Sequence, residues 1–139
     1  MNKKRIFETI KNSLIKKDDI EFAYIYGSFA AGTENPLSDI DVAVYQRANK
    51  TAYDYRMVEF AIESELIQSI PSFKFDVRSL NDAPLIVTGK ILNEGRLLFM
   101  KDDKFYYDYL VNNRIKYMDY CFIYDPLFNE RYENLINDR

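Results

Sequence analysis

The sequence contains no histidine, and this absence removes several classes of enzyme at once. Ser-His-Asp and Cys-His catalysis need an imidazole base, and HExxH metalloproteases and His-based zinc sites need imidazole ligands. Any chemistry must therefore depend on carboxylates and hydroxyls. Because oxygen ligands favour hard cations, a metal enzyme of this composition would use magnesium or manganese.

Cysteine is nearly absent as well, since Cys121 is the only one. One thiol forms neither an intrachain disulfide nor a cysteine-based zinc site, which is typical of a reducing cytoplasm. The basic first residues lead into an amphipathic pattern, and no apolar run approaches the roughly 20 residues that span a bilayer. We therefore expect a cytoplasmic protein with no membrane segment.

Glycine and proline are scarce, with four of each among 139 residues, whereas 47% of the residues are hydrophobic. This composition excludes fibrous and disordered chains, and the length suffices for one buried core. A net charge of −3 also argues against direct nucleic-acid binding, which needs a basic face. We predict a single domain over residues 1–139, with a core at 18–100 and a helical tail at 101–139.

Apolar residues at spacings of three and four, the pattern of an amphipathic helix, recur along the chain. Thr51 begins one such segment as an N-cap. Asn81 or Asp82 caps another, which has Pro84 in its first turn and closes near Gly95. Helices are therefore predicted at residues 2–17, 28–31, 51–70, 81–93 and 102–125, with a last turn or frayed tail at 128–135.

Runs rich in β-branched and aromatic residues predict strands between these helices. No internal repeat or low-complexity linker separates them. The simplest fold class is therefore α/β, or α+β, in which a small mixed β-sheet is flanked by helices and a C-terminal aromatic helix follows. The predicted strands cover residues 21–26, 40–45, 73–80 and 96–100.

The segment at residues 26–44 combines a tight turn, a hydroxyl and two carboxylates. A glycine after a strand, such as Gly27, lets the backbone approach a phosphate, and free amides at a helix start attract an anion to which Ser28 can add a bond. The plainer alternative is an ordinary turn with Ser28 as N-cap. A P-loop is excluded because no lysine precedes Thr33, and no GxGxxG fingerprint is present.

Asp39 and Asp41 follow Ser28 after ten residues, and strand alternation points both carboxylates the same way. At about 6 to 7 Å their charges repel by roughly 2 to 3 kcal/mol at an effective dielectric constant near 20. Solvent would screen this repulsion on an exposed edge. A divalent ion with a bound triphosphate would offset it better.

Asp76 is a third candidate, because it lies between Lys74 and Arg78 on the polar face of a predicted strand. Taken alone, it fits a salt-bridged surface acid, and the two bases fit solvated charges more simply than phosphate contacts. If this strand lies beside the one with Asp41, however, three carboxylates converge. Such a group suits two Mg²⁺ ions arranged for phosphoryl or nucleotidyl transfer.

The motif as a whole, Gly-Ser, ten residues, Asp-Ile-Asp and then a lone acid after a helix, resembles the minimal nucleotidyltransferases of the DNA polymerase β superfamily. The resemblance covers residues 18–100 and implies a polymerase β-like fold. In that family the Gly-Ser turn holds the nucleoside triphosphate, and the Asp-x-Asp pair binds two magnesium ions. The third acid completes the metal site and activates the attacking hydroxyl. The resemblance thus implies nucleotide-binding roles for Gly27 and Ser28, and metal-binding and catalytic roles for Asp39, Asp41 and Asp76.

Within this superfamily the chain is similar to MntA-type antitoxins of MNT/HEPN toxin–antitoxin pairs, through its GSFAAG, SDID and DVRSLN segments. The resemblance implies transfer of AMP from ATP, with Mg²⁺, to a tyrosine of a HEPN ribonuclease toxin. Ala31 departs from the family pattern, which has a basic residue there, so we expect one phosphate contact fewer. The tail is rich in aromatic residues, among them Tyr106, Tyr107, Tyr109, Tyr117, Tyr120 and Tyr124. We expect most of these side chains to fill the core and the others to suit a partner interface.

Two other functions remain open. A small-molecule nucleotidyltransferase of the antibiotic-modifying kind would keep the fold and change the acceptor. Such enzymes add a helical domain, and only about forty residues follow Met100 here, too few for a second core. Alternatively, the acids bind nucleotide without catalysis, and the antitoxin acts by occluding its partner.

Overall fold

The computed structural model describes residues 2–35, 38–125, 127 and 130 of the chain. Of the last turn expected at 128–135, only residue 130 belongs to them. Within this described part, each helix is too short or too polar to cross a membrane. The elements follow the predicted order: α1 (Lys3–Ile15), β1 (Ile20–Tyr26), α2 (Gly27–Ala31), β2 (Ile40–Gln46), α3 (Ala52–Ser69), β3 (Phe75–Ser79), α4 (Leu85–Glu94), β4 (Arg96–Met100) and α5 (Asp103–Tyr124).

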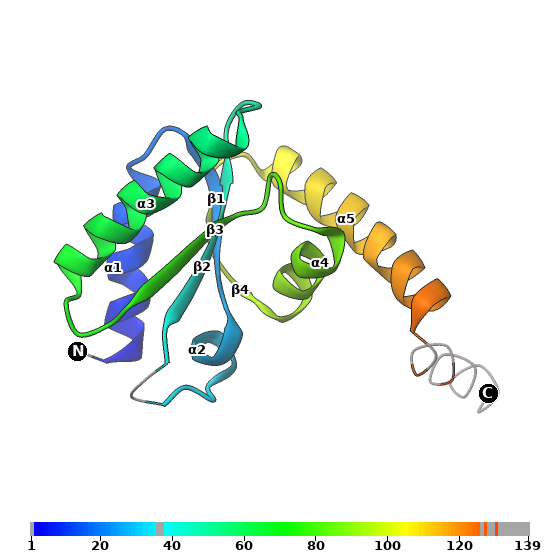
Figure 1. Ribbon diagram of the computed structural model, residues 1–139, viewed down its shortest axis with the longest axis horizontal. Coiled ribbons are helices and arrows are strands. Elements are labelled where there is room, and N and C mark those ends of the chain that lie inside the picture. Colours follow the sequence, from blue (N-terminus) through cyan, green and yellow to red (C-terminus); the bar gives the residue numbers. More distant parts are fainter. Residues whose placement is uncertain (1, 36–37, 126, 128–129, 131–139) are drawn as a thin grey trace.

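The strands form one mixed sheet in the order β3-β2-β1-β4. β1 is antiparallel to both β2 and β4, whereas β2 and β3 are parallel. The parallel pair needs a crossover, and α3 provides it. Figure 1 shows α1 and α3 on one side of the sheet and α4 and α5 on the other. The expected mixed sheet flanked by helices is therefore confirmed.

Alternation along β2 divides its side chains between two cores, one on each face of the sheet. Ile40, Val42 and Val44 pack in the core that α1 and α3 complete, as predicted. Ala43 belongs to the second core, which includes residues of α4 and α5. Asp41 shares this second face with Ala43, because side chains two positions apart on a strand point the same way.

The first half of α5 attaches this helix to the second core. Tyr106 and Leu110 are buried, and the Tyr106 hydroxyl hydrogen-bonds to the Tyr24 hydroxyl. The second half extends away from the sheet (Figure 1). Core filling is thus confirmed for Tyr106, whereas Tyr107 and Tyr124 are 52% and 69% exposed. An exposed apolar row on α5, which we call the α5 stripe, consists of Tyr107, Val111, Ile115, Met118 and Phe122.

The helix predicted at 81–93 begins four residues later than expected, at Leu85, so its predicted start was wrong. The Asn81 side chain is occupied elsewhere, because it accepts from the backbone N–H of Gln46 and donates to the carbonyl of Gln46, both at 2.8 Å. These bonds hold Asn81 beside the end of β2 instead of at a helix start. Pro84 takes the N-cap position, and Gly95 closes the helix as predicted.

Gly89 lies in the interior of α4, where glycine is unfavourable by about 1 kcal/mol relative to alanine. A Cβ at this position would lie 2.2 Å from the ring of Tyr117 on α5. The glycine therefore lets the two helices approach each other closely.

Strand β3 is an edge strand, and carboxylates from α3 cap its outward amides. Glu63 accepts from the N–H of Val77 at 2.9 Å. Glu59, which is only 8% exposed, accepts from the N–H of Ser79 at 3.0 Å and from its hydroxyl at 2.6 Å. Capping in this way covers an edge that would otherwise present unpaired backbone groups. β3 begins at Phe75, two residues later than predicted.

Replacing Glu59 with alanine is expected to destabilise the protein by about 2–4 kcal/mol, because it leaves the buried Ser79 amide and hydroxyl without their acceptor. Urea unfolding monitored by circular dichroism measures this change. Glu65→Ala is the matched control on the same helix. Its partner Lys17 lies at 2.7 Å in an exposed pair, so about 0–1 kcal/mol is expected. Equal losses in the two variants would contradict the edge-capping role.

Candidate active site

Strand pairing brings two of the predicted acids together. In the parallel ladder of β2 and β3, Asp41 is the register partner of Asp76. Register partners on neighbouring strands lie about 4.8 Å apart and point to the same face. Asp41 is half-buried, whereas Asp76 is exposed. Asp39 is exposed and lies just before β2, one residue from its start.

Gly27 is the first residue of α2 and lies directly against Asp41, one member of this acid pair. Its φ of 72° is in the left-handed region that favours glycine. A Cβ built on it would lie only 2.3 Å from Oδ2 of Asp41. Both observations exclude a side chain here, so the glycine leaves the space that the Asp41 carboxylate occupies beside the turn.

Ser28 is the second residue of α2, and the N-cap of this helix is Tyr26. The plain alternative, in which Ser28 is an ordinary N-cap, was therefore wrong. The Ser28 hydroxyl makes no hydrogen bond with any described residue, although its carbonyl accepts from the N–H of Thr33 at 3.0 Å. The side chain is half-buried, and the role of holding a phosphate stays a prediction.

The acids influence one another electrostatically. Burial raises the pKa of Asp41, the charges of Asp76 and then Asp39 raise it further, and Arg78 opposes the rise. The site thus concentrates negative charge around a half-buried carboxylate. A cation would relieve this repulsion.

The donor atoms fit magnesium, which binds through one or two carboxylates together with substrate phosphates. No three acid, cysteine or histidine side chains among the described residues lie close enough to form a metal-holding group by themselves. Asp41 and Asp76 are brought together by register, whereas Asp39 lies one residue before the paired register begins. The metal-binding roles of all three therefore stay predictions.

Replacing Asp41 with asparagine is expected to stabilise the metal-free protein at neutral pH. Two like unit charges near 5 Å would repel by several kcal/mol without screening, and exposure of Asp76 and Asp39 reduces the gain to about 1 kcal/mol. The thermal midpoint in EDTA should therefore rise by about 3–6 °C. Asp108→Asn, on the exposed side of α5, is the control and should leave the midpoint within about 2 °C.

The stability gain of Asp41→Asn should depend on pH, in a direction that the pKa of Asp41 fixes. Because the folded-state pKa of Asp41 is raised, its favourable contribution is present below the ordinary carboxyl pKa and is lost as pH rises through the folded value. The advantage of the asparagine variant should therefore grow as pH rises from acidic to neutral. A constant difference across that range would contradict the repulsion.

Tyr26 and Arg78 complete the polar surroundings of the acids. Tyr26 pairs across the strands with Asp41, and it was missed in the sequence because only its place in the β1–β2 register reveals it. Burial raises the pKa of Tyr26 to about 12, Arg78 opposes this rise and Asp41 adds to it. Arg78 lies two residues after Asp76 on the same face, and Lys74 precedes β3.

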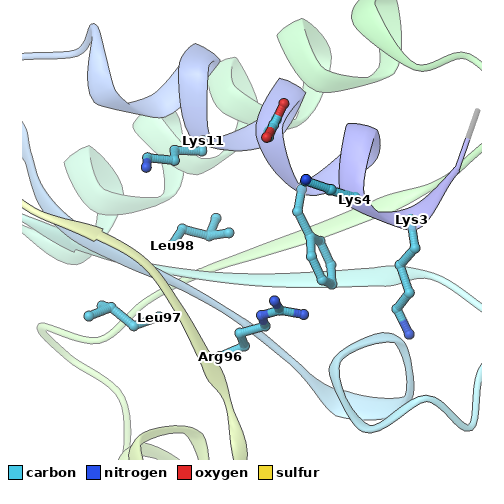
Figure 2. A pocket seen from close by; sticks show the side chains of 8 residues that line it. Lys3, Lys4, Lys11, Arg96, Leu97 and Leu98 are labelled. Carbon is cyan, nitrogen blue, oxygen red and sulfur yellow. The ribbon is translucent and has the colours of Figure 1, made fainter.

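A cavity of about 430 Å³ lies between α1 and β4, on the face of the sheet opposite to the one that carries Asp41. Figure 2 shows Lys4 and Lys11 of α1 on one side of it and Arg96 of β4 on the other. The Arg96 guanidinium lies 4.8 Å from the ring centroid of Phe7. None of the candidate site residues lines this cavity, so size alone does not locate the site.

Comparison with solved structures shows the same fold in toxin–antitoxin complexes. One is a tri-AMPylated Shewanella oneidensis HEPN toxin in complex with an MNT antitoxin, with a TM-score of 0.66, 14% identity, and coverage of 99% of this chain and 98% of that one. A mutant of the toxin–antitoxin MntA–HpeT gives a TM-score of 0.65 at 15% identity, with the same coverage. A toxin–antitoxin with AMP-PNP gives 0.61 at 19% identity, again covering 99% and 98%.

These likenesses extend over nearly the whole chain, and together with the family match given below they confirm the expected polymerase β-like fold. Among curated proteins, no sequence matches. The family model described as polymerase beta, nucleotidyltransferase matches residues 8–104, which is well over half of the chain and includes every predicted site residue. The chain belongs to the polymerase β nucleotidyltransferase family.

Proposed function

We propose that this protein is an antitoxin that transfers AMP from ATP to a tyrosine of a HEPN-family ribonuclease toxin and thereby silences it. The observation that carries this proposal is the register of Asp41 with Asp76 beside Gly27, in a chain of the nucleotidyltransferase family. This arrangement puts the Asp41 carboxylate against a turn whose backbone is open to a phosphate, with the Asp76 carboxylate on the neighbouring strand. We also place the reaction in the cytoplasm, which the single cysteine supports.

Each predicted residue receives a role in this proposal. Gly27 and Ser28 seat the triphosphate through the backbone and the hydroxyl of the turn. Asp39 and Asp41 hold magnesium, of which we expect two ions, and Asp76 completes that site. When bound, the metal would neutralise charge on the acids and the phosphates.

Asp76 also serves as the base in the transfer step. The acceptor phenol gives its proton to Asp76, and its oxygen forms a bond to the α-phosphorus of ATP. The bond from that phosphorus to the β-phosphate oxygen breaks, and pyrophosphate leaves. Asp76 is exposed at the edge strand, where an acceptor from another protein can reach it.

A toxin partner agrees with the surface of α5. The α5 stripe exposes between 49% and 55% of each of its apolar side chains along one side of the helix. Such a row is typical of a protein interface. Solved structures with this fold include complexes of an MNT antitoxin with a HEPN toxin and a complex with AMP-PNP, which supports both the partner and ATP as the substrate.

Occlusion without catalysis is the second candidate, and one observation favours it. Ala31 is exposed at the end of α2 and offers no cation to a phosphate. An antitoxin of this kind would inhibit the toxin equally well without ATP.

Incubation of the purified protein with its toxin, labelled ATP and magnesium tests the proposal. We expect label on one toxin tyrosine, and none when that tyrosine is replaced with phenylalanine. Toxin inhibition without any label would instead support occlusion. Aminoglycoside resistance in cells that express the protein, without toxin labelling, would support a small-molecule acceptor.

A further inference from the structure

A cavity of about 240 Å³ lies beside Asp76, on the outer side of the edge strand β3. Residues of α3, β3 and the turn before α4 line it. This volume is below the roughly 300 Å³ at which small-molecule sites begin, so the cavity is too small for a nucleotide. It suits one inserted side chain.

Strand order puts this cavity on the acceptor side of the site. The order β3-β2-β1 places Asp76 on the edge strand, Asp41 on the next one and Gly27 at the end of the third. A triphosphate seated on Gly27 therefore lies across Asp41 from the cavity. An acceptor in the cavity would meet Asp76 from the side opposite the departing pyrophosphate, as in-line transfer requires.

Two arginines line the cavity, and they differ in whether an acidic side chain pairs with them. Arg56 donates to Glu59 at 2.9 Å and to Asp82 at 2.7 Å, so its charge is balanced and it fixes one wall. Arg78 forms no ion pair with any residue in the described part of the chain. Its exposed guanidinium is therefore available to a ligand beside Asp76.

The remaining wall is formed by Ala83 and Pro84, which offer small apolar surfaces. A phenol matches this combination, because its ring can pack on an apolar wall and its face attracts a guanidinium. The planar guanidinium also stabilises the negative charge that develops on the phenol oxygen as its proton leaves.

We propose that this cavity is the acceptor-tyrosine pocket and that Arg78 is the residue that recognises the tyrosine. The inference rests on the proposed AMP transfer and adds to it the contact that selects a phenol. The phenol proton goes to Asp76, the phenol oxygen bonds to the α-phosphorus of ATP, and pyrophosphate leaves.

Steady-state transfer by Arg78→Ala, with toxin and ATP varied separately in magnesium, tests this assignment. We expect the KM for toxin to rise about ten- to a hundredfold, as for loss of a contact to a charged group, and the KM for ATP to change less than about twofold. Arg78→Lys should recover part of the loss, because it keeps the charge and lacks the planar fork.

Lys74→Ala is the matched control, because Lys74 is the other exposed base two positions from Asp76 and does not line the cavity. Ala83→Phe, which fills the cavity from its apolar wall, should abolish transfer and leave binding of ATP intact. Both variants and Arg78→Ala should keep the wild-type thermal midpoint within a few degrees.

An unchanged KM for toxin in Arg78→Ala, or an equal rise in Lys74→Ala, would overturn the pocket and leave the proposed AMP transfer standing. A rise in the KM for ATP alone would place Arg78 at the triphosphate and overturn the pocket as well. Absence of any transfer by the wild-type protein would overturn both the pocket and the proposed function.

Discussion

An Asp39→Ala/Asp41→Ala double variant is expected to lose AMP transfer by at least about a thousandfold. Removing one preorganised charge-stabilising group from an active site costs about 10²–10³ in rate, and this variant removes two proposed metal ligands. The rate of label transfer from ATP to the toxin measures the loss. Undiminished transfer would refute the assignment of these acids.

The control for this variant is Glu8→Ala/Asp18→Ala, which also removes two negative charges, but from exposed positions on and beside α1. Its transfer rate should stay within about twofold of the wild type. Unfolding cannot explain the loss in the site variant, because relief of repulsion at Asp41 should maintain or raise its thermal midpoint. A fall in that midpoint would show that the acids hold the fold rather than the substrate.

Gly27→Ala is expected to destabilise the protein by about 2–4 kcal/mol and to reduce transfer by at least about a hundredfold. The left-handed φ of 72° costs roughly 1–2 kcal/mol for a residue with a Cβ. The remainder comes from overpacking, since the new Cβ would lie 2.3 Å from Oδ2 of Asp41 and would displace that carboxylate. Urea unfolding and the label-transfer assay measure the two losses.

Gly32→Ala is a matched control, because Gly32 has nearly the same φ, 77°, and no atom within 4 Å of its Cβ position. This variant should lose about 1–2 kcal/mol of its free energy of unfolding and keep its AMP-transfer activity. In an Asp41→Ala background the extra cost at Gly27 should disappear, since the clash partner is gone. Equal costs at the two glycines in the wild-type background would mean that Asp41 does not crowd Gly27.

Periodicity and spacing predict most of the fold, because the patterns reflect local requirements. The order of helices and strands, Thr51 as N-cap of α3, Gly95 at the end of α4 and the two faces of β2 are all confirmed. The start of α4 could not be predicted, since Asn81 and Asp82 are both good caps. Tertiary contacts decide against both, since the Asn81 side chain bonds to the backbone of Gln46 and the Asp82 carboxylate pairs with Arg56.

The candidate site can be predicted only in part from the sequence, because it too depends on tertiary contacts. Spacing selects the glycine and the acids, but the register that puts Asp41 beside Asp76 depends on β2 and β3 being parallel neighbours. Tyr26 and the cavity at Arg78 arise from that register and from the turn before α4, so no local pattern reveals them. The structure also gives a second reason for a glycine at position 27, because the missing side chain makes room for Asp41 in addition to leaving the backbone open.

The central claim is that this protein modifies its partner covalently, and the intact mass of the co-purified toxin tests it most directly. The toxin should be isolated from cells that also express either the wild-type protein or the Asp39→Ala/Asp41→Ala variant. We expect toxin heavier by one or more adenylyl groups with the wild type, and toxin of unmodified mass with the variant. Inactive toxin of unmodified mass in both preparations would contradict the account.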